Sequence, residues 1–259
     1  MRFQNKVVVI TGTAGGQGRE AAIRFASEGA IVAGCDVNAA GNNETKSLVE
    51  AVGGRMLSHA PVDLTNEVAV ANWIADIISN VGKIDVLYAN AGATKFSPIE
   101  ETSFEEWQFV LKHELDLVFL PVKHSWKHLV ESKGNVILVG STAGIAGSIT
   151  NTRVAHSVTK GGVIAMGRQL AAEGAKYGIR ANTVSPGMVR TPATENDLLA
   201  ENHPMRTIEK SIPLGRIGTA VEVVNCALFL ASDEASYVTG ANLVVDGGWS
   251  AVLPGANQQ

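Results

Sequence analysis

Short, nearly continuous apolar runs that are rich in β-branched residues recur along the chain and alternate with longer segments of helical period. Continuous apolarity is typical of strands that helices cover on both faces, as in a parallel sheet. Six of these runs are clear, and a weaker seventh precedes Asp63. The predicted strands are 6–10, 31–35, 56–62, 86–89, 136–139, 179–184 and 243–245.

The segments between these runs show the period of amphipathic helices. Because strands and helices alternate, the pattern predicts βαβ units with right-handed crossovers, and therefore one doubly wound α/β domain over residues 1–259. A parallel sheet of about seven strands would carry helices on both faces. Pro121 lies inside the longest predicted helix and is expected to kink it, because proline lacks a backbone donor. The predicted helices are 16–28, 44–52, 67–81, 104–132, 153–177 and 220–230.

Composition and charge exclude several classes of protein. Of the 259 residues, 46% are apolar and 18% are charged, so the chain can bury a large core. No apolar run approaches the roughly 18 residues that a membrane span requires. Residues 1–5 lead directly into the first predicted strand and not into a signal-peptide cleavage region, which predicts a cytoplasmic chain. The net charge is −4 and no block of like charges occurs, which argues against a nucleic-acid partner.

The cysteines and histidines give no sign of a disulfide or a metal site. Cys35 and Cys226 are the only cysteines, and both lie in apolar runs, which predicts buried thiols. His124 and His128 have the spacing of two metal ligands on one helix face, but no third ligand lies near them in the sequence. We therefore expect no metal.

A glycine-rich turn joins the first predicted strand to the first predicted helix. It reads Thr-Gly-Thr-Ala-Gly-Gly-Gln-Gly over residues 11–18. Glycine lets the backbone approach a pyrophosphate, which the positive end of the following helix attracts. The second predicted strand leads into Asp36, whose carboxylate can accept hydrogen bonds from the ribose hydroxyls of an adenosine. Together these features predict a dinucleotide site.

In these motifs the chain resembles the short-chain dehydrogenase/reductase family. The family's TGxxxGxG motif is met from Thr11 to Gly18, residues 90–92 match its NAG motif, and residues 185–191 resemble the segment that packs on the nicotinamide. The likeness extends over residues 6–249 and implies a Rossmann-like fold. The cofactor-binding residues that it implies are Gly12, Gly16, Gln17, Gly18, Asp36, Asp63, Leu64, Asn90, Gly92, Lys160, Pro186, Val189 and Thr191.

Asp36 also distinguishes between the two nicotinamide cofactors that the resemblance allows. Its negative charge would repel the 2′-phosphate of NADP, and the neighbouring Gly15 and Val37 supply no compensating cation. The sequence therefore favours NAD.

The expected catalytic residues depart from the family pattern at two of four positions. Family members use Asn, Ser, Tyr and Lys, with tyrosine as the general acid/base of a YxxxK motif. Ser141 and Lys160 match the serine and the lysine. His156 stands where the tyrosine is expected, and Glu114 stands where the asparagine is expected.

Two interpretations of this site remain open. In the first, His156 is the acid/base of an NAD-dependent oxidoreductase that interconverts a secondary alcohol and a ketone, and Glu114 pairs with Lys160 or relays protons through water. Imidazole reaches less far than a phenol, so this interpretation requires a bridging water or a deeper substrate. In the second, the chain binds NAD but is redox-inactive, or catalyses a non-redox lyase or isomerase reaction with His156 and Glu114. An engineered replacement of tyrosine would explain His156 but not Glu114.

The substrate loop and the assembly are predicted more coarsely. Residues 185–213 contain several prolines and form a long connection, which predicts a substrate loop.

The resemblance implies that helices 104–132 and 153–177 pair between subunits of a homotetramer, or failing that a dimer. The side chains expected to line the substrate pocket are Phe96, Ile149, Met188 and Trp249, and the small residues expected to permit close helix pairing are Ala155, Gly161, Gly162, Ala165 and Gly167.

Overall fold

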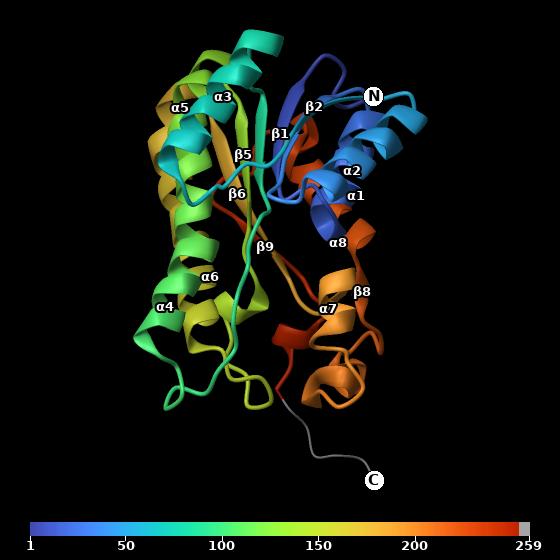
Figure 1. Cartoon of the computed structure of the whole chain (residues 1–259), viewed down its shortest axis with the longest axis vertical. Helices are drawn as coiled ribbons and strands as arrows, with labels where there is room; N and C mark the ends of the chain where they lie inside the picture. The colour runs from blue at the N-terminus through green and yellow to red at the C-terminus, as the bar shows by residue number, and fades with distance from the viewer. Residues whose placement is uncertain (254–259) are drawn as a thin grey trace.

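A seven-stranded sheet in the order β3-β2-β1-β4-β5-β6-β9 forms the centre of the molecule, and every neighbouring pair is parallel (Figure 1). This computed structural model describes residues 1–253, so the last part of the expected domain, 254–259, lies outside the described residues. The predicted parallel sheet is confirmed. Its strands are β1 Val7–Thr11, β2 Ile31–Cys35, β3 Arg55–His59, β4 Val86–Ala89, β5 Asn135–Val139, β6 Arg180–Pro186 and β9 Asn242–Val245.

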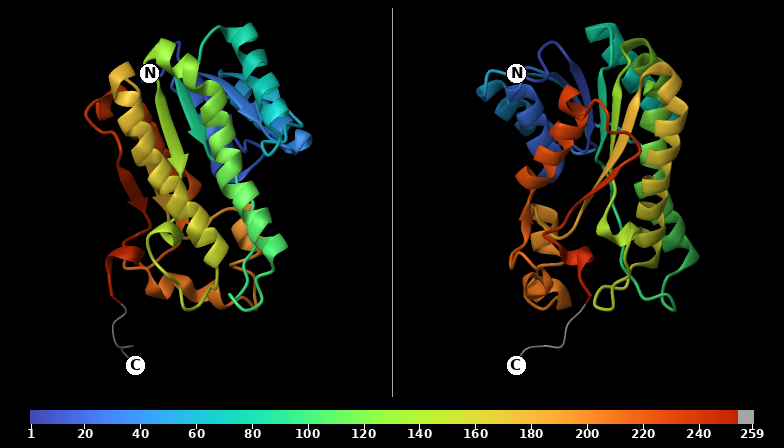
Figure 2. Two further views of the ribbon diagram at one scale, coloured as in Figure 1. Left: turned by 90° about the vertical axis from the view of Figure 1, so that its left-hand side faces the viewer. Right: turned by 180° about the vertical axis from the view of Figure 1, so that it is seen from behind.

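Helices cover both faces of the sheet, as predicted (Figures 1 and 2). Alternate residues of β1 explain the two layers, because successive side chains of a strand point to opposite faces. Val8 and Ile10 belong to the apolar cluster under one layer, whereas Val7 and Val9 belong to the other cluster. One layer comprises α1 Gly16–Ser27, α2 Ala39–Ala51 and α8 Ala220–Ala231, and the other comprises α3 Glu67–Val81, α4 Phe104–Leu111, α5 Leu117–Ser132 and α6 Val154–Gly174.

Most element boundaries agree with the sequence pattern within a few residues, and α2 is the clearest exception. It begins five residues before the predicted start at residue 44 because Asn38 caps it, with the Asn38 side chain accepting a hydrogen bond from Gly41 N at 3.1 Å. The third strand ends at His59 and not at residue 62. Cys35 is buried as predicted, whereas Cys226 on α8 is only partly buried against the edge of the core.

The longest predicted helix, 104–132, is three elements in the structure. A π-helical segment, η1 Lys112–Asp116, separates α4 from α5. The irregular segment precedes Pro121, and α5 continues through this proline. A π-turn adds a residue to one turn of a helix and is frequent at functional sites. Here it carries Glu114.

The predicted substrate loop is an ordered excursion at the carboxyl ends of the strands. It contains β7 Val189–Arg190, α7 Pro192–Asn196 and the 3-10 segment η4 Pro204–Ser211, and β7 pairs with β8 Gly218–Thr219. A small apolar cluster of its own, centred on Met205 and Ile208, holds it together. The remaining short 3-10 segments are η2 Thr142–Gly144, η3 Ala175–Tyr177, η5 Asp233–Ala235 and η6 Trp249–Ala251.

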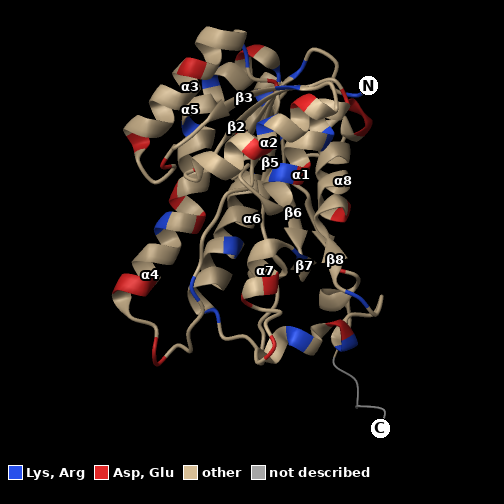
Figure 3. Cartoon of the chain, turned by 45° about the vertical axis from the view of Figure 1, so that its right-hand side comes forward, with Lys and Arg blue, Asp and Glu red and all other residues tan. Residues whose placement is uncertain are grey.

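Two further features concern the distribution of charged residues and the apolarity of the helices. Basic and acidic residues are interspersed over the helices, without a single-sign patch in the view of Figure 3. Within residues 1–253, no helix combines the length and the apolarity that crossing a bilayer demands.

Candidate active site

A cleft of about 940 Å³ opens at the carboxyl ends of the strands, where the sheet order reverses between β1 and β4. In open α/β sheets this reversal creates the crevice in which ligands bind. The cleft is lined by residues of the glycine turn, by residues that follow β2 and β4, and by residues of the excursion after β6. The expected cofactor residues that line it are Gly12, Gly16, Gln17, Asp36, Asp63, Leu64, Asn90, Gly92 and Thr191.

The glycine turn forms a cradle that larger residues would fill. Gly12 has a φ of +76°, and a Cβ atom at Gly18 would lie 2.0 Å from the carbonyl oxygen of Gly12. The turn therefore closes on itself only with glycine at residue 18, which explains why Gly18 does not line the cleft. At the same place Gln17 Oε1 is buried and has no hydrogen-bond partner among the described residues, so a donor from a bound molecule would satisfy it.

Asp36 lies beside the cradle, directly after β2. Its Oδ2 accepts a hydrogen bond from Ala14 N and its Oδ1 accepts one from Asn38 N, each at 2.9 Å. Each carboxylate oxygen keeps a second lone pair for a ligand hydroxyl. Arg19, which the sequence reasoning missed, also lines the cleft, but it forms an ion pair with Glu44 at 2.6 Å.

Asp63 and Asn90 are held by their own neighbours. Asp63 Oδ1 accepts hydrogen bonds from the Thr65 hydroxyl at 2.7 Å and from Thr65 N at 2.8 Å, and these bonds lower the pKa of Asp63. Asn90 Nδ2 donates to Thr11 O at 3.1 Å, which ties the end of β4 to the end of β1. This bond fixes the Asn90 side chain where it lines the cleft.

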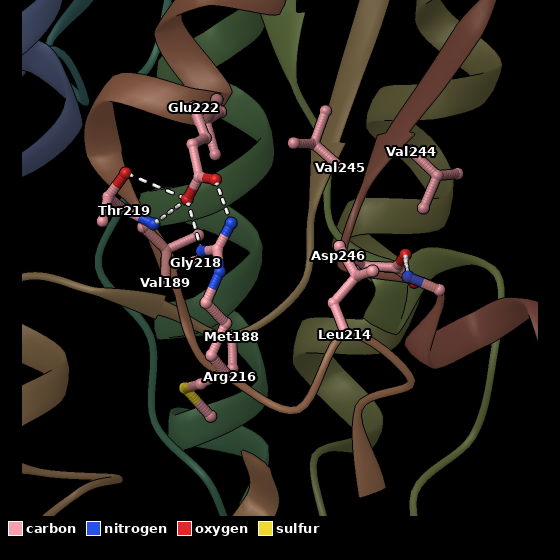
Figure 4. A pocket seen from close by; sticks show the side chains of 13 residues that line it. Met188, Val189, Leu214, Arg216, Gly218, Thr219, Glu222, Val244, Val245 and Asp246 are labelled. Carbon is pink, nitrogen blue, oxygen red and sulfur yellow. Dashed lines mark hydrogen bonds and ion pairs between the residues drawn. The ribbon is translucent and has the colours of Figure 1, made fainter.

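Pro186 and Val189 lie outside the lining of the main cleft. Pro186 ends β6, and Val189 lines a separate pocket of about 230 Å³ together with Met188 (Figure 4). An ion pair closes one side of this second pocket, where Arg216 Nη1 lies 3.0 Å from Glu222 Oε2.

A buried carboxylate organises the expected catalytic residues. Glu114 is only 3% exposed. His156 Nδ1 lies 2.8 and 2.9 Å from its two oxygens, and the Thr159 hydroxyl donates to Oε2 at 2.7 Å. Lys160 Nζ lies 4.0 Å from Oε1 and donates to Val139 O at 3.2 Å. The expected proximity of Glu114 and Lys160 is therefore confirmed.

The charges of this cluster stabilise one another. Burial alone would raise the pKa of Glu114, but the hydrogen bond with His156 and the charge of Lys160 outweigh it and lower that pKa, so the carboxylate is ionised at neutral pH. Burial lowers the pKa of Lys160, and the charge of Glu114 opposes this shift.

The contact with Glu114 selects the tautomer of His156. An ionised carboxylate can only accept hydrogen bonds, so Nδ1 must carry a proton, and in the neutral ring Nε2 is then an acceptor. Among the described residues, Nε2 has no hydrogen-bond partner. Phe96, expected in the pocket, places its ring edge to face with the imidazole at a centroid distance of 5.5 Å.

The cluster adjoins the main cleft. A Cβ atom at Gly92, which lines that cleft, would lie 3.9 Å from Lys160 Nζ and 4.0 Å from Glu114 Cγ. Ser141 follows β5 and caps η2, with its hydroxyl oxygen accepting a hydrogen bond from Ala143 N at 3.1 Å. The end of η2 packs against Lys160, because a Cβ atom at Gly144 would lie 2.6 Å from the Lys160 carbonyl carbon.

Sequence reasoning missed Thr159. Thr159 follows His156 by three residues, the helical spacing at which side chains share a face, and that signal could have identified it. Ile149, expected in the pocket, is fully exposed, whereas Met188 and Trp249 belong to the small cluster of the excursion. His124 and His128 each contact a different glutamate, and the described residues include no group of three or more potential metal ligands.

Comparison with known proteins identifies the family. A family model described as enoyl-(acyl carrier protein) reductase matches residues 12–250. Meso-2,3-butanediol dehydrogenase of Serratia marcescens is 36% identical over 255 residues, which cover 97% of each chain. The chain belongs to the short-chain dehydrogenase/reductase family.

Solved structures of this family have the same fold. A short-chain type dehydrogenase/reductase from Mycobacterium marinum superposes with a TM-score of 0.91 at 30% identity, covering 96% of this chain and 97% of that one. Levodione reductase gives 0.91 at 33% identity, with 97% and 100% covered. Members of the short-chain dehydrogenase/reductase family generally use NAD(P), and these relatives support an alcohol or ketone oxidoreductase.

Proposed function

We propose that the chain is an NAD-dependent oxidoreductase that interconverts a secondary alcohol and a ketone, with His156 as the general acid/base. The observation that carries this proposal is the bond between the buried Glu114 carboxylate and His156 Nδ1, which leaves Nε2 as an acceptor. A carboxylate that orients a histidine in this way is a recurrent arrangement for proton transfer in enzymes.

The residues of the cleft fit an NAD molecule. The glycine cradle suits a pyrophosphate, Gln17 Oε1 lacks a donor, and Asp36 has free lone pairs for ribose hydroxyls. By family resemblance, Asp63 and Leu64 would contact the adenine, Lys160 the nicotinamide ribose, and the segment from Pro186 to Thr191 the nicotinamide. When bound, NAD supplies the hydride acceptor for alcohol oxidation.

The side chains of the cluster would divide the proton chemistry between them. In oxidation, neutral His156 accepts the alcohol proton at Nε2, and in reduction the imidazolium returns a proton to the carbonyl oxygen. Ionised Glu114 holds the ring and stabilises the imidazolium as it forms. The Thr159 hydroxyl fixes the carboxylate, and Ser141 orients the substrate oxygen.

This division of roles explains why the two departures from the family pattern occur together. Beside Lys160 alone, an imidazolium would face a like charge in a buried site. Glu114 lies 2.8 Å from His156 Nδ1 and 4.0 Å from Lys160 Nζ, so its negative charge attracts both cations and reduces their mutual repulsion. We therefore infer that Glu114 and His156 act as one unit.

A turnover assay tests the proposal directly. NADH formation is followed with a panel of secondary alcohols, including cyclic and steroidal ones, from mildly acidic to alkaline pH. Turnover of a panel member is the expected result. Tight NAD binding without turnover across the panel would instead favour the alternative, a redox-inactive protein or a lyase or isomerase that uses the same Glu114–His156 pair.

A further inference from the structure

A buried threonine of α2 is bonded to the glycine turn. Thr45 is fully buried, and its hydroxyl donates to the carbonyl oxygen of Thr13 at 2.7 Å. The carbonyl oxygen of Gly41, one turn earlier in α2, lies farther from this hydroxyl, at 3.0 Å. The hydroxyl oxygen also accepts a hydrogen bond from Arg19 Nε at 3.0 Å. Thr45 is not part of the lining of the main cleft, so any influence on a cofactor must pass through the residues to which it is bonded.

The carbonyl oxygen that Thr45 holds belongs to the peptide group between Thr13 and Ala14. The other end of this peptide group, Ala14 N, donates to Asp36 Oδ2 at 2.9 Å. A trans peptide group is planar, so its C=O and its N–H point in opposite directions and turn together. The Thr45 hydroxyl therefore fixes the direction of the donor that holds the Asp36 carboxylate.

Further polar groups anchor the same turn to α2 and its surroundings. The Thr13 hydroxyl donates to Asn42 Oδ1, and Asn42 Nδ2 donates to the Ser58 hydroxyl at 2.9 Å. Arg19 Nη2 donates to Ala14 O at 2.7 Å, which holds the next carbonyl group of the turn. Thr13 and Asn42 are fully buried. Because hydrogen-bonded polar networks in a protein interior favour a single geometry, this network fixes the backbone of the turn.

Both oxygens of Asp36 take their direction from α2. Oδ1 accepts from Asn38 N at 2.9 Å, and Asn38 is the residue that caps the helix. Oδ2 accepts from Ala14 N, whose peptide group Thr45 holds. The direction matters because a hydrogen bond to a ribose hydroxyl weakens steeply when donor and acceptor are misaligned. A carboxylate that is free to rotate can also turn away from a 2′-phosphate, which weakens the repulsion between them.

We propose that Thr45 is a positioning residue for cofactor selectivity. Through the peptide group between Thr13 and Ala14, it holds Asp36 in the orientation that accepts the ribose hydroxyls of NAD and repels the 2′-phosphate of NADP. This inference rests on the proposed function, because it concerns the selectivity of the NAD site. Without the hydroxyl, the peptide group is free to turn and Asp36 loses the fixed direction of one of its two donors. The preference for NAD then falls, although Asp36 itself is unchanged.

Nucleotide binding to three variants of Thr45 tests the proposal. Thr45→Val removes the hydroxyl at nearly constant volume, Thr45→Ala removes it with a smaller side chain, and Thr45→Ser keeps it. Titration calorimetry measures Kd for NAD and for NADP with each protein. We expect Thr45→Val and Thr45→Ala to reduce the ratio of the two Kd values about threefold or more, since one hydrogen bond is at stake. Thr45→Ser should keep the ratio.

Ser47→Ala is the matched control on the same helix. Ser47 is exposed, and its hydroxyl donates to Asn43 O within α2. Removing this hydroxyl should leave the ratio of the Kd values unchanged. A ratio that stays unchanged in both Thr45→Val and Thr45→Ala, or that falls equally in Ser47→Ala, would overturn the proposal.

A double-mutant cycle with Asp36→Ala separates positioning from a general weakening of the turn. A merely structural defect raises both Kd values by the same factor and leaves their ratio unchanged. If Thr45 acts through Asp36, Thr45→Val should change the ratio in the unmodified protein but not in the Asp36→Ala protein. An effect of equal size in both proteins would contradict the proposed path through Asp36.

Binding to the unmodified protein distinguishes a failure of this inference from a failure of the proposed function. If the unmodified protein binds neither nucleotide, or binds NADP as tightly as NAD, the proposed NAD dependence is wrong and this inference fails with it. If a clear preference for NAD survives the loss of the Thr45 hydroxyl, only this inference is wrong. None of these titrations requires turnover, so they do not depend on the role of His156.

Discussion

At the scale of single residues, one buried carboxylate holds the candidate catalytic residues together. Glu114 receives hydrogen bonds from His156 and Thr159 and lies near Lys160, so a charge that burial would otherwise disfavour is fully compensated. The same contacts leave only one nitrogen of His156 available to a substrate. The acid/base role that we propose for His156 depends on this compensation.

Replacing His156 tests that role. His156→Ala should lower turnover by a factor on the order of 10² to 10⁴, while NAD affinity stays nearly unchanged because other residues hold the cofactor. His156→Tyr discriminates further, since raised alcohol oxidation would indicate an ordinary family scaffold with a weakened base. Steady-state kinetics and NAD titration measure both effects. Full activity of His156→Ala would make Ser141 or Glu114 acting through water the leading candidate.

The pH profile of the same enzyme carries a second signature of these residues. Alcohol oxidation requires a base that can accept the alcohol proton, and no phenol stands at position 156 to supply one. At alkaline pH the rate should fall earlier than an ordinary lysine would predict, because burial lowers the pKa of Lys160 and its positive charge is lost sooner. A rate of alcohol oxidation that rises only at the alkaline pH where phenols lose their proton would contradict His156 as the base.

Asp36 leads to a prediction about cofactor choice. NAD should bind far more tightly than NADP, because the Asp36 carboxylate would repel a 2′-phosphate and the nearby Arg19 is already paired with Glu44. Asp36→Ala should narrow the difference in Kd by about tenfold or more. Titration calorimetry with both cofactors measures it, and equal affinities in the unmodified protein would be incompatible with this reading of Asp36.

At the scale of elements, the π-helical segment η1 positions the carboxylate. A regular α-helix advances about 100° per residue, so one residue more or less in this turn redirects every side chain that follows relative to the preceding helix. Glu114 is buried in η1, and the residues it contacts lie on the neighbouring α6. The geometry of the Glu114–His156 pair therefore depends on the length of this turn.

Deleting Lys112 tests the role of η1. Removing one residue should restore α-helical register, turn Glu114 away from His156 and lower kcat to the level of a Glu114→Gln variant, with helical content unchanged by circular dichroism. Glu114→Gln keeps η1 and removes only the charge, so it serves as the matched comparison. A deletion variant with the turnover of the unmodified enzyme would show that η1 does not position Glu114.

At the scale of the whole molecule, the outer faces of α4, α5 and α6 are the candidate contact surface between subunits. Phe104, Phe119 and Val158 are exposed there. Only some of the small residues expected to permit helix pairing are free of contacts within the chain. A Cβ atom at Gly167 would lie 2.4 Å from Thr183 Oγ1, and Ala155 is buried, so both serve packing within the chain, whereas Ala165 is exposed.

We predict that the chain forms a homotetramer, with a dimer as the next possibility. Light scattering at micromolar concentration measures the mass, and a value near the 27.1 kDa of one chain would contradict the prediction. Val158→Glu should shift the population to smaller species, because a charge would be buried at the contact. Val68→Glu on α3, which changes another exposed valine outside the proposed contact surface, should leave the mass unchanged.

Local sequence patterns were sufficient to predict the sheet and to point to the residues that line the candidate cleft. Apolar runs reveal strands covered on both faces, and glycine at residues 12 and 18 is required by the backbone geometry of the turn itself. The place of Asp36 beside the glycine turn could be predicted because this residue comes directly after a strand. Each of these features depends on interactions within a short segment, or on a periodicity that the chain displays directly.

The catalytic arrangement required the tertiary structure, because its contacts join distant segments. Glu114 and His156 are 42 residues apart in the chain, and no periodicity indicates that a π-turn aims the one at the other. Hydrogen-bond partners across elements depend on how helices pack, and this packing minimises the free energy of the whole molecule rather than of any one segment.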